Sequence, residues 1–106
     1  MKNTLIKALE EQLELKELEQ KRIIGEIIRI KKEDESSNVD ALKEAYIKST
    51  EPIVWLKKAI LHEQRTNELP KDFDEKLLID DARLKEWLFD YAKGINEKHL
   101  RECGVL

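Results

Sequence analysis

The sequence has few of the residues that interrupt helices. It contains only three glycines and two prolines among 106 residues, while hydrophobic and charged side chains each account for 41%. This balance is typical of long, charged helices rather than of strands joined by turns. Leucine and isoleucine dominate the apolar residues, so the chain is hydrophobic enough to fold despite its high charge. We therefore expect an all-α protein, with residues 1–106 forming a single helical domain.

Long apolar runs are also missing. Residues 1–10 have an amphipathic pattern that includes acidic and basic side chains, unlike the apolar stretch of a signal peptide, and no later run is long enough to span a bilayer. The single cysteine, Cys103, cannot form an internal disulfide, which agrees with a reducing compartment. These features predict a cytoplasmic protein that does not enter a membrane.

Neither sign of charge is in large excess. The chain has 20 basic and 23 acidic residues, giving a net charge of −3, and no segment is a basic or acidic block. Proteins that bind nucleic acid through phosphate contacts usually have a concentrated basic face, and proteins that imitate nucleic acid have a large acidic excess. The sequence therefore does not favour nucleic acid as a partner.

The first third of the chain has the apolar spacing of a coiled coil. Residues at alternating intervals of three and four form a seam in a helix expected over residues 3–35, and these are Ile6, Leu9, Leu13, Lys16, Gln20, Ile23, Ile27 and Ile30. Lys16 and Gln20 are the polar members, and polar residues at such positions restrict register or oligomeric state. A helix of this length would extend beyond a compact domain, so part of the seam is open to pairing within the chain or with a second copy.

Three further helices are expected after this one. The second covers residues 39–66 and is either kinked or broken near Pro52, because proline lacks the backbone donor that a helix interior needs. The third covers 74–93 and ends at Gly94, and a short fourth covers 97–103 and ends at Gly104. The expected architecture is a long antiparallel hairpin with the third helix and the short C-terminal helix packed against it.

The sequence offers little chemistry for catalysis or for a cofactor. His62 and Glu63 begin a zinc-helix motif, but Thr66 stands where the second histidine is needed. Acidic residues near the start of the third helix lack the glycine and spacing of a calcium loop, and a favourable interaction with the helix amino terminus explains them. His99 lies four residues before Cys103 and could promote its ionisation, which is the only arrangement that suggests a reactive group. We therefore expect no enzyme activity, metal, cofactor or small-molecule substrate.

Several apolar residues lie off the main helical seams. Leu15 and Leu18 leave the seam of the first helix, and Trp55 and Leu61 leave that of the second. Apolar residues in such places can anchor a partner. The leading interpretation is a small regulatory or adaptor protein that binds another protein or forms a homodimer through its first helix. A stoichiometric inhibitor, such as one encoded by a phage or another mobile element, fits the same description.

A DNA-binding alternative uses residues 87–103. Their outline resembles a helix-turn-helix, with Gly94 in the turn and a short second helix carrying Lys98 and Arg101 toward DNA. Two glutamates on that helix and the acidic balance of the chain argue against it. An ordinary helical corner around Trp87 and Tyr91 is the competing explanation.

Overall fold

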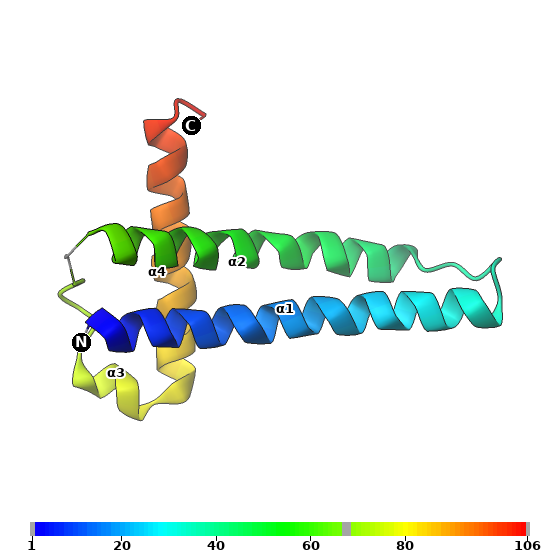
Figure 1. Ribbon diagram of the computed structural model, residues 1–106, viewed down its shortest axis with the longest axis horizontal. Helices are drawn as coiled ribbons and strands as arrows, with labels where there is room; N and C mark the ends of the chain where they lie inside the picture. The colour runs from blue at the N-terminus through cyan, green and yellow to red at the C-terminus, as the bar shows by residue number, and fades with distance from the viewer. Residues whose placement is uncertain (1, 67–68, 106) are drawn as a thin grey trace.

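The protein is all-helical, as the sequence predicts. The computed structural model describes residues 2–66 and 69–105, and these form α1 (Lys2–Glu33), α2 (Asp40–Arg65), α3 (Glu75–Ile79) and α4 (Asp81–Glu102) without a strand. Helices α1 and α2 form a long antiparallel hairpin, and α4 crosses it at a steep angle near the end that holds the start of α1 (Figure 1). The hairpin and the all-α class are therefore confirmed.

The two polar residues of the α1 seam have different partners, Gln20 on α2 and Lys16 on α4. The Nε2 atom of Gln20 donates to Oγ of Ser49 at 2.9 Å and to Oγ1 of Thr50 at 3.1 Å. Lys16 Nζ lies 5.3 Å from the ring centroid of Phe89, on α4. Because Gln20 finds these partners in only one alignment of the two helices, this layer favours the observed register.

The connection from α1 to α2 is held by local hydrogen bonds. The Asp34 carboxylate accepts from the Ser36 amide at 3.0 Å and from its hydroxyl at 2.7 Å. These two bonds hold the pKa of Asp34 below its ordinary value, since they stabilise the charged form. Lys31 Nζ donates to the carbonyl of Ser37 at 2.7 Å, and Val39 is buried where α2 begins.

Pro52 lies inside α2 without dividing it. The helix is continuous from Asp40 to Arg65, so the alternative of a break near residue 52 is wrong. Proline removes the donor that the carbonyl of Lys48 would otherwise use, but Ile53 and Leu56 are buried immediately afterwards. Packing on this side of the helix offsets the lost hydrogen bond.

The third predicted helix and the short fourth one are organised differently in the structure. The range expected as one helix over 74–93 is divided at Asp80, whose side chain accepts from the Arg83 amide at 3.2 Å and caps α4. Conversely, α4 continues through Gly94, so the predicted helix end there and the separate helix over 97–103 are wrong. A glycine with ordinary helical geometry weakens a helix but does not end it.

Gly104 ends α4 as expected. It is the only described residue with a positive φ, at 76°. Its amide donates to the Arg101 carbonyl at 3.1 Å, and the Val105 amide donates to the Leu100 carbonyl at 2.9 Å. These two bonds are those of a Schellman cap, which places glycine in the left-handed conformation.

The hydrophobic core lies where α4 crosses the hairpin. Its fully buried members include Leu5 and Leu9 of α1, Leu56 and Ala59 of α2, and Leu88 of α4. The chain segment before α3 joins this core through Phe73 and through Asp72, which accepts from the indole of Trp87 at 2.7 Å. Packing is therefore concentrated at one end of the hairpin.

The other end of the hairpin extends away from this core. We call it the arm, comprising residues 16–33 of α1 and 40–52 of α2. Within it no side chain is fully buried, and seam residues such as Ile23, Ile27 and Tyr46 are only half-buried. The radius of gyration is 16.8 Å, compared with about 13 Å for a compact domain of this length. Beyond its base, where Lys16 lies near Phe89 of α4, the arm is thus a projection of two helices alone (Figure 1).

Candidate functional site

The crossing of α2 and α4 creates two grooves on the protein surface. Lys58 of α2 borders both, and its Nζ donates to Oδ1 of Asn96 on α4 at 2.8 Å. This bond ties the two helices together between the grooves. The C-terminal part of α4 projects beyond α2 here (Figure 1).

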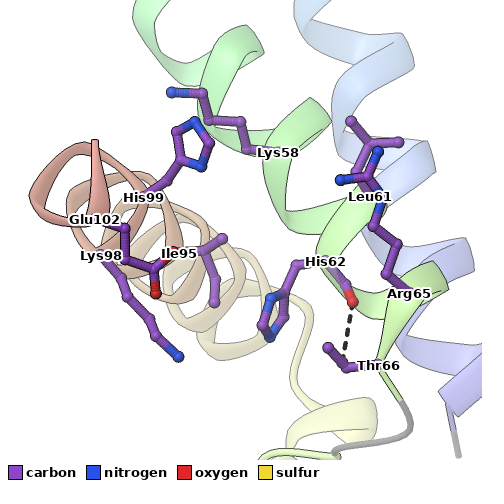
Figure 2. A pocket seen from close by; sticks show the side chains of 9 residues that line it. All are labelled: Lys58, Leu61, His62, Arg65, Thr66, Ile95, Lys98, His99 and Glu102. Carbon is purple, nitrogen blue, oxygen red and sulfur yellow. Dashed lines mark hydrogen bonds between the residues drawn. The ribbon is translucent and has the colours of Figure 1, made fainter.

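The first groove is rich in basic side chains, and we call it the basic groove. It has a volume of about 370 Å³ and is lined by Lys58, Leu61, His62, Arg65, Thr66, Ile95, Lys98, His99 and Glu102. Figure 2 shows His62 of α2 and His99 of α4 directed into the space between the helices, with Ile95 between them. Five basic side chains therefore surround a groove that has one acidic residue, Glu102.

A neighbouring hollow adds another cation to this region. It shares His62, Ile95 and Lys98 with the basic groove and is also lined by Lys71. With both histidines neutral, the two hollows carry four positive charges and one negative charge, a local net charge of +3. Since the whole chain has a net charge of −3, the remaining residues together have a net charge of −6. The basic residues are concentrated in space although the sequence has no basic block.

The second groove contains Trp55, one of the residues predicted to bind a partner. Its volume is about 510 Å³, and its lining includes the apolar side chains of Val54, Trp55 and Leu100. Trp55 is only half-buried and packs against the edge of the core, with Lys93 Nζ 5.8 Å from its ring centroid. The residue therefore serves the fold and also borders an accessible groove.

The other predicted contact residues lie on different parts of the surface. Leu15 and Leu18 of α1 are 52% and 44% exposed, and Leu18 borders a shallow hollow made by α1 alone. Leu61 lines the basic groove, on the opposite side of Lys58 from the Trp55 groove. The structure thus brings Trp55 and Leu61 to the same crossing but leaves Leu15 and Leu18 on the other hairpin helix.

Sequence reasoning missed a regular apolar stripe on α2. Ile47, Val54 and Leu61 are 67%, 39% and 47% exposed. Because seven residues make nearly two helical turns, these side chains point the same way and form a line about 21 Å long. We call them the α2 stripe. Their seven-residue spacing was visible in the sequence, but Ile47 and Val54 could not be told from core residues without the structure.

The predicted DNA-binding residues do not occupy a helix-turn-helix. Gly94 is within continuous α4, so the geometry expected for residues 87–103 is wrong. Lys98 lines the basic groove, whereas Arg101 is exposed on α4 outside its lining. The two residues therefore do not form the exposed reading helix on which the DNA-binding alternative was based.

Glu63 is an unexpected residue in the protein interior. It is completely buried, and its Oε1 atom accepts a hydrogen bond from the hydroxyl of Tyr91 on α4. Its Oε2 atom has no hydrogen-bond partner among the described residues. A buried carboxyl group with one unsatisfied oxygen carries a desolvation cost. Glu63 lies three residues after Ile60 and continues the buried face of α2, but a charged side chain does not by itself predict burial.

The residues considered for catalysis and metal binding are also placed by the structure. Cys103 Sγ lies 3.6 Å from His99 Nε2, and the thiol is exposed at the end of α4. Asp74 and Asp80 lie at the amino termini of α3 and α4, where their side chains cap the helices. In residues 2–66 and 69–105, no group of three or more suitable side chains could hold a metal ion. The absence of enzyme activity stays a prediction.

Comparisons with known proteins found no protein-family model, no curated protein and no solved structure that matches the chain. In the described part of the chain, no helix has the length and apolar character needed to cross a membrane.

Proposed function

We propose that this protein is a small regulatory or adaptor protein that acts by binding another protein. The observation that carries the proposal is the α2 stripe, whose three large apolar side chains are exposed at heptad spacing. A partner helix can pack along such a stripe through its own apolar face. Stoichiometric inhibition of the partner is one way in which such binding would regulate it.

The uneven packing of the hairpin supports the same proposal. The arm has a seam that is only half-buried, and Ile24 and Ile28 of α1 are exposed there as well. Exposed apolar groups that lie close together are characteristic of interaction sites. A partner that covered the arm would remove this apolar surface from water, at about 25 cal/mol for each Å² buried.

The proposal is tested by capturing a partner and reconstituting the complex from purified components. Ile47→Asp and Val54→Asp should weaken binding at least about tenfold, because charge is then placed in an apolar contact. Lys43→Asp and Glu44→Asp, at exposed positions of the same helix, are the controls and should leave the affinity nearly unchanged. Full retention of binding by the two stripe variants would contradict the proposed surface.

Two further measurements separate a heterologous partner from a second copy of the chain. Light scattering coupled to size exclusion, with a reductant and over a concentration series, determines whether the protein self-associates. Hydrogen exchange of the arm amides should slow when the partner binds, since amides of loosely packed segments exchange through local opening. A dimer that loses its stability with Ile47→Asp would identify the second copy as the partner.

A further inference from the structure

We infer that the basic groove binds an acidic peptide segment of the protein partner. The inference rests on the proposed function and adds the chemistry of the partner. Cationic side chains reach the groove from both helices, and they are Lys58, His62, Arg65, Lys98 and His99. A ligand bearing carboxylates is complementary to this charge, and complementary charge gives specificity to an interface.

The helix ends reduce the positive charge of the groove without cancelling it. Both α2 and α4 end near it, and each helix C-terminus contributes a partial charge of about −0.5. Lys58, Arg65, Lys98 and Glu102 contribute a net charge of +2, so about one positive charge remains when both histidines are neutral. Lys71, in the adjoining hollow, adds one more. The helix ends therefore explain why basic residues are tolerated here but do not neutralise them.

The apolar part of the groove favours a peptide over a nucleic acid. Leu61 and Ile95 contribute to its lining, and Glu102 would repel a continuous phosphate backbone. Leu61 also belongs to the α2 stripe, so the apolar contact surface leads directly into the basic groove. An amphipathic partner segment could place apolar side chains along the stripe and carboxylates near Arg65 and Lys98.

The inference is tested with peptide probes and the isotopically labelled full chain. The probe is the capped peptide acetyl-LEELEE-amide, and acetyl-LQQLQQ-amide is the neutral control. The acidic peptide should shift backbone amide signals in residues 58–66 and 95–102, and binding should weaken as salt is raised, because salt screens exposed charges. The neutral peptide should bind at least about tenfold more weakly, a difference of about 1.4 kcal/mol.

Charge reversal identifies the groove as the site. The double variant Arg65→Glu and Lys98→Glu should reduce affinity for the acidic peptide at least about tenfold. The matched control, Lys43→Glu with Lys85→Glu, makes the same change in net charge at exposed positions outside the groove and should retain binding. Circular dichroism and urea unfolding establish that both variants are folded.

Three results would overturn the inference. These are no saturable shifts at millimolar peptide, equal loss of binding in both double variants, or tighter binding of a twelve-base-pair DNA duplex to the same residues. The assay leaves Ile47 and Val54 unchanged and uses no natural partner. Its failure would therefore exclude the acidic ligand while leaving the test of the α2 stripe to decide the proposed function separately.

Discussion

The buried carboxyl group of Glu63 provides a direct test of the energetic reasoning. Glu63 is fully buried, one oxygen accepts from Tyr91, and the other has no partner among the described residues. An unsatisfied buried polar group costs about 1–3 kcal/mol. Glu63→Met keeps a side chain of similar length and removes that cost. It also removes the acceptor of Tyr91, but Tyr91 is only half-buried and its hydroxyl can donate to water instead. The variant should therefore raise the free energy of unfolding by about 1–3 kcal/mol.

The measurement is urea unfolding at pH 7, followed by far-ultraviolet circular dichroism. Each 1 kcal/mol should also raise the melting temperature by roughly 4–8 °C for a domain of this size. Glu44→Met, at an exposed position of α2, is the control and should change stability by no more than about 0.5 kcal/mol. If Glu63→Met destabilises the protein by 1 kcal/mol or more with an unchanged denaturant dependence, the carboxyl group is net stabilising and the reasoning is refuted.

A double-mutant cycle extends the test to the hydrogen bond itself. Tyr91→Phe alone should destabilise the protein by about 1–3 kcal/mol, because Oε1 of Glu63 then loses its hydrogen-bond donor while Oε2 already has none among the described residues. In the Glu63→Met background the same change should cost less than in the natural sequence. Equal costs in the two backgrounds would mean that the two side chains are not energetically coupled.

Three other predictions follow from the helices and their connections. Gly94→Ala should stabilise the protein by about 0.5–1 kcal/mol in urea unfolding, since no neighbour obstructs the added methyl group, whereas Gly104→Ala should destabilise it because of the positive φ. Ser36→Ala should raise the pKa of Asp34 in an NMR titration, although the hydrogen bond from the amide of residue 36 should keep this pKa below its ordinary value. The stabilisation that Asp34 contributes is present above its unfolded pKa and is lost as the pH falls through the folded pKa. Gln20→Leu should increase self-association in sedimentation equilibrium, because the polar layer that restricts pairing is removed.

The hairpin could be predicted because its determinants are local and periodic. The α1 seam runs at heptad spacing through Ile23, Ile27 and Ile30, which requires only the sequence to recognise. The cap at Gly104 is equally local, since it depends on one residue that can adopt a positive φ. The structure adds the reason for a polar seam position by placing Ser49 and Thr50 opposite Gln20.

The boundaries of α3 and α4 could not be predicted because competing local signals differ little in energy. A helix end was expected at Gly94, whereas the structure divides the range at Asp80 and continues α4 through Gly94. Capping by an aspartate and the cost of an interior glycine are each about 1 kcal/mol. Tertiary packing decides between them, since Leu88 and Ala92 are buried against the hairpin and hold the middle of α4 helical.

The basic groove could not be predicted from the sequence because it depends on how the helices cross. Its cations come from the last turns of α2, from α4 and, in the adjoining hollow, from Lys71, with acidic residues between them in the sequence. Only the crossing angle of α2 and α4 brings them together. A pattern of basic residues near the ends of two helices is also what helix dipoles favour, so the sequence pattern alone did not distinguish a binding site from ordinary helix ends.

Binding of the proposed partner should be coupled to folding through the uneven core. Fully buried side chains such as Leu9, Leu56 and Leu88 hold the crossing, while Ile23 and Ile27 in the arm remain half-buried. Local opening of the arm should therefore require less free energy than opening of the crossing. A partner that binds only the closed arm stabilises it by an amount that increases with partner concentration. The α2 stripe extends from Ile47 in the arm to Leu61 at the crossing, so one bound helix would join the least stable part of the hairpin to its most stable part.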